Sequence, residues 1–277
     1  MSPWAWLQAA GPFGHRRVLF IGLVSALVGI ACGLVLFPNE ASLIGVVLVA
    51  MSQSAVVGGL LDRNRDEIWG ESVEPGLANR KLATSLLVLF MGVFFAYALT
   101  VQLAPEARLL DWFDRQLGDF AAGSLLDIDF SDFEHLLGRN VLVLAACFTF
   151  ALIYRHGGML LVLAWNASRW GVIFSYLARQ AGQDPDVEPA AYLAKTFVCI
   201  LPHLVLEAVA YILVAMSGVF LSKALTKYSL GSAEFLQVGS AVLRIFWMSM
   251  AVLVAAALVE AYLAPELIEL LFLGSPA

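Results

Sequence analysis

The residues best suited to chemistry are a histidine and a glutamate inside an apolar run. His203 and Glu207 stand in the stretch PHLVLEAVAYILVAMSG, residues 202–218. Four residues apart on a helix, the two side chains share one face and can hydrogen-bond each other or a common partner. Such a pair can transfer protons or contribute to a metal site. One residue of each kind is too few to hold a metal ion, so we expect no metal and no cofactor.

Other polar residues also interrupt apolar stretches. Asn166 and Arg169 are spaced to share a helix face, and Asn140 stands at the start of another apolar run. Arg169 is the natural counter-charge for a buried carboxylate, because pairing keeps both groups ionised. The candidate carboxylates are Glu207 and Glu260, of which Glu207 lies deeper in its run. The predicted intramembrane polar cluster comprises Asn140, Asn166, Arg169, His203, Glu207 and Glu260.

Three interpretations of this cluster remain open at the level of sequence. Ionisable groups at bilayer depth are costly, so they face a protein interior or a water-filled path. The cluster could be a buried ion pair that fixes the bundle, the lining of a channel or transporter, or an acid–base pair. The sequence has no phosphate-binding loop, no dinucleotide fingerprint and no nucleophile elbow. We therefore expect no enzymatic activity.

The elements that must position these residues are membrane-spanning helices. The chain has 277 residues, of which 61 % are hydrophobic and 14 % charged, far from the balance of a soluble domain. About 20 apolar residues are needed for each helical crossing. This predicts an all-α transmembrane bundle with about seven segments: 18–37, 42–61, 82–103, 140–154, 159–177, 194–221 and 245–263.

The fourth and fifth segments form a predicted helical hairpin. They are joined by Arg155, His156, Gly157 and Gly158, and the glycine pair permits a tight reversal. The segment 140–154 is short, so the hairpin could be re-entrant or could cross the membrane fully. Later in the chain, Pro202 removes a backbone donor and predicts a kink in the sixth segment.

The distribution of basic residues predicts the orientation of the chain. With the N-terminus in the cytoplasm, the inner segments hold Arg16, Arg17, Arg63, Arg65, Arg80, Lys81, Arg155, Lys223, Lys227 and Arg244, and the outer segments hold Arg108, Arg115, Arg139, Arg179 and Lys195. The positive-inside rule favours this arrangement. We expect a multi-pass protein of the plasma membrane with a cytoplasmic N-terminus and an outer C-terminus.

Three parts of the chain follow from these spans. Residues 1–61 form an N-terminal transmembrane hairpin, 62–81 a cytoplasmic loop of mixed charge, and 82–277 a core of five segments. Within the core, Leu109, Phe113 and Leu117 recur at helical spacing in an outer segment, 104–137, which predicts an amphipathic helix on the membrane surface. Ser131 and Glu134 have the spacing of a capping box for a second short helix.

Several of these motifs together resemble the stage II sporulation protein M family of membrane proteins. The motifs are LGRN at 137–140, Asn166, PHLVLE at 202–207 and AALVEAYLAP at 256–265. The resemblance covers about residues 82–265 and implies functional positions at Asn140, Asn166, His203, Glu207, Glu260 and Pro265. The chain departs from the family pattern in two places: Ala167 follows Asn166 where glycine is usual, and Arg139 stands where an asparagine often occurs.

The resemblance implies a membrane scaffold that organises other proteins, and the cellular process stays open. We therefore expect a non-enzymatic scaffold or complex subunit, with a channel or transporter as the alternative. The expected partners are the lipid bilayer, a second copy of the chain in a homo-oligomer (a dimer is favoured), and membrane or cell-envelope proteins. No basic stripe is present, so we expect no binding of nucleic acid.

Overall fold

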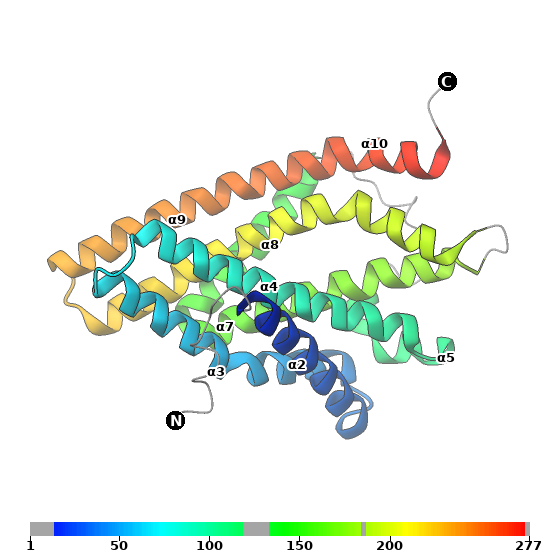
Figure 1. The fold of residues 1–277 in the computed structure, drawn as a ribbon, viewed down its shortest axis with the longest axis horizontal. Helices are drawn as coiled ribbons and strands as arrows, with labels where there is room; N and C mark the ends of the chain where they lie inside the picture. Colours follow the sequence, from blue (N-terminus) through cyan, green and yellow to red (C-terminus); the bar gives the residue numbers. More distant parts are fainter. Residues whose placement is uncertain (1–13, 119–132, 184–186, 275–277) are drawn as a thin grey trace.

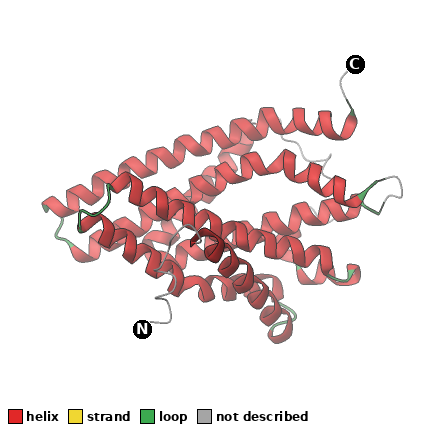
Figure 2. Cartoon of the chain, viewed as in Figure 1, coloured by secondary structure: helices red, strands yellow, loops and turns green. Residues whose placement is uncertain are grey.

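The chain forms a bundle of long helices (Figure 1). The computed structural model describes residues 14–118, 133–183 and 187–274, and all regular elements in these ranges are helical (Figure 2). The elements are α2 (Gly14–Leu36), α3 (Ala41–Trp69), α4 (Pro75–Leu103), α5 (Glu106–Trp112), α6 (Asp114–Leu117), α7 (Phe133–Ala181), α8 (Pro189–Lys227), α9 (Ala233–Leu258), η3 (Val259–Leu263), α10 (Ala264–Ile268) and η4 (Glu269–Leu273).

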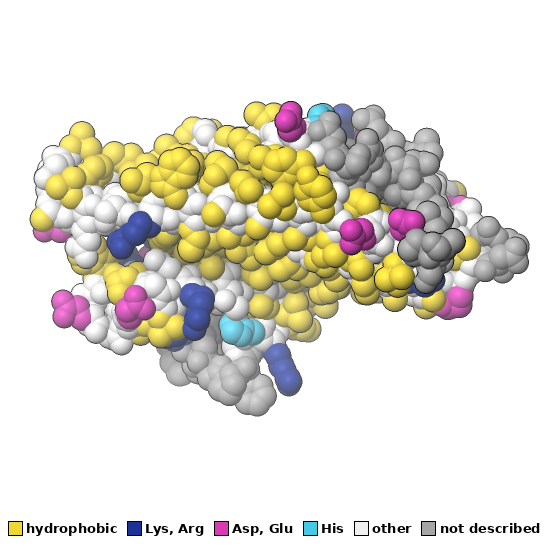
Figure 3. Space-filling view, turned by 90° about the horizontal axis from the view of Figure 1, so that it is seen from above, with side chains coloured by type: hydrophobic (Ala, Val, Ile, Leu, Met, Phe, Trp, Pro, Cys, Tyr) yellow, Lys and Arg dark blue, Asp and Glu magenta, His cyan; other side chains and the backbone are white. Residues whose placement is uncertain are grey.

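The predicted all-α membrane bundle is confirmed. In the described part of the chain, six helices are long and apolar enough to cross a bilayer. One of these, α7, has 49 residues and reverses direction inside, so its two arms count as separate segments and the total is about seven. Hydrophobic side chains cover most of the face shown in Figure 3, as expected for a surface in contact with lipid.

The reversal inside α7 depends on Arg155 and Gly158. Arg155 adopts φ 56° and ψ −137°, a conformation that side chains other than glycine rarely take. A Cβ on Gly158 would lie 2.0 Å from the carbonyl oxygen of Phe150, so only glycine allows the arms to come this close. The first arm begins at Phe133 and not at residue 140, which makes it long enough for a full crossing.

The central helix of the bundle is α8, which packs against both arms of α7 and against α9. Figure 1 shows that α8 changes direction in its N-terminal half, where Pro202 lies inside the helix. On the other side of the bundle, α2 packs on α3 and α4. Gly22 of α2 and Gly92 of α4 touch there, because a Cβ on either would lie 2.5 Å from a carbonyl oxygen of the other helix.

One end of the bundle carries a concentration of basic residues, and we call it the basic end. The α3–α4 and α8–α9 connections lie together at this end, at the left of Figure 1. The reversal inside α7 lies at the same end, because Arg155 Nη2 donates a 3.2 Å hydrogen bond to Thr226 Oγ1 near the end of α8. Lys223 also forms a 3.4 Å salt bridge with Asp62, which ties α8 to α3. The basic end is defined by Arg65, Arg155, Lys223, Lys227 and Arg244.

At the opposite end, the segment after α4 packs into the bundle. Leu109, Phe113 and Leu117 share one face as predicted, but α5 and α6 are short and bury all three side chains. Gln116 anchors α6 by donating from Nε2 to the carbonyl oxygen of Ser42 at 2.9 Å. The one long helix expected here is thus two short helices in the structure, whose apolar face packs on the bundle and whose charged face is exposed. A position on the membrane surface stays a prediction. Ser131 of the predicted capping box lies outside the described residues.

The predicted 62–81 loop is much shorter in the structure. Helix α3 continues to Trp69 and α4 begins at Pro75, so residues 70–74 alone connect them. Glu74 caps α4 by accepting from the backbone N–H groups of Gly76 and Leu77 at 3.1 and 3.2 Å. Most charged residues of this stretch therefore lie on the ends of α3 and α4, and Glu71 and Glu74 lie in the connection.

The strained backbone at Arg155 gives a stability prediction. A non-glycine residue in such a conformation costs about 1–3 kcal/mol. We expect Arg155→Gly to stabilise the protein by about 1 kcal/mol, because glycine relieves the strain but adds freedom to the unfolded chain. Thermal unfolding in detergent, followed by tryptophan fluorescence, measures the change. Arg155→Ala is the control: it also removes the charge and the Thr226 contact but keeps a Cβ, so it should not stabilise. Equal changes in stability for the two variants would contradict the assignment of backbone strain to Arg155.

Candidate functional site

The intramembrane polar cluster is built around Asn140. Its side chain donates from Nδ2 to Glu207 Oε1 of α8. Its Oδ1 accepts a 3.2 Å hydrogen bond from the Tyr211 hydroxyl, one turn further along α8. Asparagine can donate and accept at once, so a single amide links the first arm of α7 to two residues of α8. Glu207 is 4 % exposed, which places this linkage in the interior of the bundle.

A second carboxyl group, Glu260, completes the cluster. It lies beside Glu207 and Asn140, close enough to act on both. An ionised carboxylate only accepts hydrogen bonds, so a direct bond between the two carboxyl groups requires a proton on one of them. The positive charge of Arg139 acts on both carboxyl groups.

The position of Glu260 depends on a local change in helix type. Glu260 lies in η3, a π-helical turn between α9 and α10. Pro265 follows five residues later and has no N–H to donate to the preceding turn, so the helix widens there to i→i+5 hydrogen bonds. The Ala264 N–H accordingly bonds the Val259 carbonyl oxygen. This explains physically why a glutamate and a proline five residues apart form one motif.

Close packing brings the two helices of the cluster together. A Cβ on Gly218 of α8 would lie 2.7 Å from the carbonyl oxygen of Phe148 and 3.0 Å from the Cβ of Ala151. Both contacts are on the first arm of α7, toward the basic end from Asn140. Small residues at such crossings allow helix backbones to approach closely, so that short side chains can hydrogen-bond across the interface. Asn140 has such a side chain, and it reaches Glu207 directly.

Other predicted members of the cluster occupy different positions. His203 is 2 % exposed and lies one turn before Glu207 on α8. Asn166 donates from Nδ2 to the Val162 carbonyl oxygen of its own helix at 2.8 Å. The structure places Arg139 where its charge acts on the carboxyl pair. A role for Arg169 in the cluster stays a prediction.

Two residues of the cluster were missed by sequence reasoning. Tyr211 stands four residues after Glu207, just as His203 stands four residues before it. The i, i+4 spacing could therefore have placed Tyr211 on the same helix face as Glu207. Its ring also lies 6.2 Å from that of Trp170, which brings the second arm of α7 to the cluster. Arg139 is exposed and precedes the apolar run, so its position outside that run concealed its role.

Comparison with known proteins agrees with the motifs at these positions. A family model described as Stage II sporulation protein M matches residues 85–265, which include Asn140, Glu207, Tyr211 and Glu260. No curated protein and no solved structure matches the chain.

The central position of Asn140 gives a second prediction. Asn140→Leu keeps a similar volume but removes the hydrogen bonds to Glu207 and Tyr211, so buried polar groups lose a partner. We expect a loss of about 1–3 kcal/mol in unfolding free energy. Denaturant or thermal unfolding in lipid–detergent micelles measures it. Asn166→Leu is the matched control, because that amide bonds only within its own helix in the described contacts. An equal loss in both variants would contradict the central role of Asn140.

Proposed function

The chain belongs to the stage II sporulation protein M family of integral membrane proteins, and we propose that it is a non-enzymatic membrane scaffold. In this function the bundle holds partner proteins of the membrane or cell envelope in place. The polar cluster has a structural role: it fixes the first arm of α7, α8 and η3 relative to one another. The observation that carries the proposal is the buried contact of Asn140 with Glu207 and Tyr211, beside Glu260 and within reach of the charge of Arg139.

The burial of the network supports a structural role over a transport role. A group that relays protons or binds a passing solute must be reached by water in at least one state. His203 and Glu207 are 2 % and 4 % exposed. Two cavities of ≈ 330 and ≈ 700 Å³ begin at the basic end, and the larger extends as far as Val209, but neither is lined by His203 or Glu207. The hydrogen bond that Glu207 accepts comes from Asn140, a protein group.

The basic end supports the proposed orientation. Arg155, Lys223 and Lys227 lie together there, with the ends of α3 and α4. Under the positive-inside rule this end faces the cytoplasm, so the N-terminus is cytoplasmic and the C-terminus lies outside the plasma membrane. Partner proteins would meet the helix ends around 62–81 on the inner side and the segment 104–137 on the outer side. We further propose that the chain forms a homo-oligomer, with a dimer favoured.

The first test separates a scaffold from a channel or transporter. The protein is reconstituted into vesicles, and the flux of protons, potassium and chloride is measured across a range of pH. We expect wild type and Glu207→Gln to pass none of them. Glu207→Gln should instead lower the unfolding free energy by about 1–2 kcal/mol, because a neutral amide replaces the carboxyl group that accepts from Asn140 and that Arg139 attracts. A wild-type flux that Glu207→Gln abolishes would overturn the proposal in favour of transport.

The second test addresses the scaffold role itself. The chain is depleted from cells that make it, and membrane complexes are compared by native electrophoresis and mass spectrometry. We expect particular envelope complexes to lose subunits and to regain them when wild type or Asn166→Leu is supplied. Asn140→Leu should restore fewer of the lost subunits, because a smaller amount of this variant is folded. If every complex keeps its composition in depleted cells, the chain is not a scaffold.

A further inference from the structure

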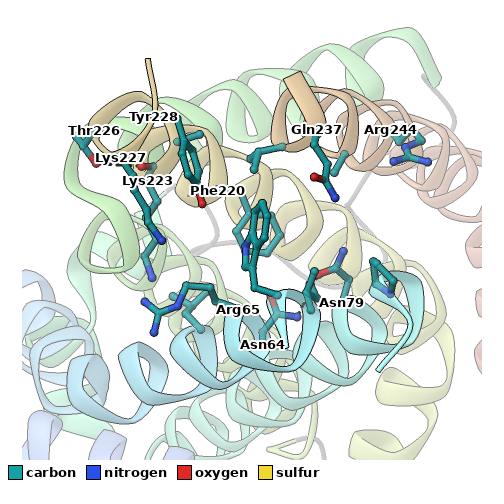
Figure 4. Close-up of a pocket in the computed structure, with 17 residues that line it drawn as sticks. Asn64, Arg65, Asn79, Phe220, Lys223, Thr226, Lys227, Tyr228, Gln237 and Arg244 are labelled. Atoms are coloured by element: carbon teal, nitrogen blue, oxygen red, sulfur yellow. Dashed lines mark hydrogen bonds between the residues drawn. The ribbon is translucent and has the colours of Figure 1, made fainter. Parts of the chain in front are cut away.

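A cavity of ≈ 330 Å³ opens at the basic end between α3, α4, α8 and α9 (Figure 4). Its lining includes four cationic side chains: Arg65, Lys223, Lys227 and Arg244. None of the residues that line it is acidic. Figure 4 shows Lys223 and Arg65 close together on one side, while Gln237 and Asn79 point toward each other across the other side. A volume of this size suits a small ligand or the headgroup of a larger one.

The charges around the cavity leave an excess of positive charge. Arg65 forms salt bridges of 3.2 and 2.9 Å with Asp62 and Asp66, and Lys223 shares Asp62 at 3.4 Å. Among the described residues, Lys227 and Arg244 form no salt bridge. Four cations are thus set against two carboxylates, and both carboxylates lie outside the lining. Phosphate carries the complementary charge and accepts hydrogen bonds from lysine and arginine.

A second cavity, of ≈ 700 Å³, continues from the first into the apolar part of the bundle. The two share Asn79 and Arg244 among their lining residues. The second cavity is a groove between α4 and α9, with Leu87 and Met248 on its walls and Ile212 of α8 on its floor. From Arg244 to Val252 the groove extends about 12 Å along α9, at 1.5 Å per residue. Where the groove begins at the basic end, its lining also includes Glu74 and Arg80, whose opposite charges offset each other, and the rest of its lining is mainly apolar. A polar, cationic mouth therefore opens into a largely apolar groove.

We propose that these two cavities form one binding site for an anionic phospholipid. The headgroup is bound in the cationic cavity, with Lys227 on one side and Arg244 on the opposite side (Figure 4), together with the amides of Asn79 and Gln237, and an acyl chain fills the groove over α8. Charge complementarity selects an anionic lipid over a zwitterionic one, because basic pockets between transmembrane helices attract negative headgroups. The groove distinguishes a lipid from free phosphate, since a small anion has no chain to bury there.

The test measures which lipid remains bound to the protein. Protein is reconstituted in nanodiscs of phosphatidylcholine with phosphatidylglycerol, then released, and retained lipid is counted by native mass spectrometry. We expect wild type to retain phosphatidylglycerol preferentially. Lys227→Gln with Arg244→Gln should lower this retention at least about fivefold, since each cation contributes to headgroup attraction. Equal retention of both lipids by wild type would overturn the proposal.

A matched control uses cations of the same end that lie outside both cavities. Arg63 and Lys81 both form salt bridges with Glu67 and line neither cavity. Arg63→Gln with Lys81→Gln removes the same formal charge, so retention should change by less than about twofold if the effect is local. A loss equal to that of the Lys227 and Arg244 pair would show a diffuse surface attraction and would overturn the proposed site.

A further variant tests the groove and separates lipid from free phosphate. Met248 is 49 % exposed, so Met248→Trp can fill the groove without disturbing the core. We expect it to reduce retention of phosphatidylglycerol while all four cations remain. Inorganic phosphate, added in excess to wild type, should not displace the lipid. If Met248→Trp has no effect, or if inorganic phosphate displaces the lipid completely, the site binds a free anion and the lipid assignment is wrong. Circular dichroism of each variant confirms that the helices are intact.

Discussion

The structure depends on keeping two carboxyl groups satisfied at bilayer depth. Neither Glu207 nor Glu260 can be solvated by lipid, and an isolated charge there would cost several kcal/mol. The fold meets this constraint with groups from three elements: Asn140 and Arg139 of α7, Tyr211 beside Glu207 on α8, and Glu260 of η3. Because these groups meet in this arrangement of the helices, the cluster favours it over other packings of the same apolar helices.

Helix packing and the polar cluster depend on each other. Gly218 lets α8 approach the first arm of α7, and that approach brings Asn140 within hydrogen-bonding distance of Glu207. At the other side, Pro265 opens the π-helical turn that holds Glu260. Lipid supplies no hydrophobic force between membrane helices, so packing and hydrogen bonds must supply the specificity. A glycine, a proline and an asparagine, far apart in the chain, thus position one carboxyl pair.

The membrane spans and the ionisable residues of the cluster could be predicted from the sequence, whereas contacts that depend on helix packing could not. Span positions follow from the apolar length that a bilayer demands, and His203, Glu207 and Glu260 stood out because ionisable groups are rare in such spans. Arg139 could not be assigned, because its role depends on how the first arm of α7 sits against α8. The packing of Leu109, Phe113 and Leu117 on the bundle could not be predicted either. An apolar helix face predicts burial, but it does not predict whether lipid or protein covers that face. The reversal was expected at a glycine pair, yet the strained residue is Arg155, and Gly158 contributes by close approach.

The central helix α8 carries two polar regions, one buried in the bundle and one beside an open cavity. Glu207 lies in its middle, where protein groups satisfy every contact that the structure shows for it, whereas Lys223 and Lys227 lie at its end beside an open cavity. Helices α4 and α9 both line the groove over α8. The position of α9 depends at one end on Glu260, which lies beside Glu207, and at the other on the short α8–α9 connection. The groove extends along α8 as far as Val209, two residues from Glu207, so the helix that lines its floor also carries the polar cluster. The width of the groove and the integrity of the cluster therefore depend on the same packing of α8 and α9.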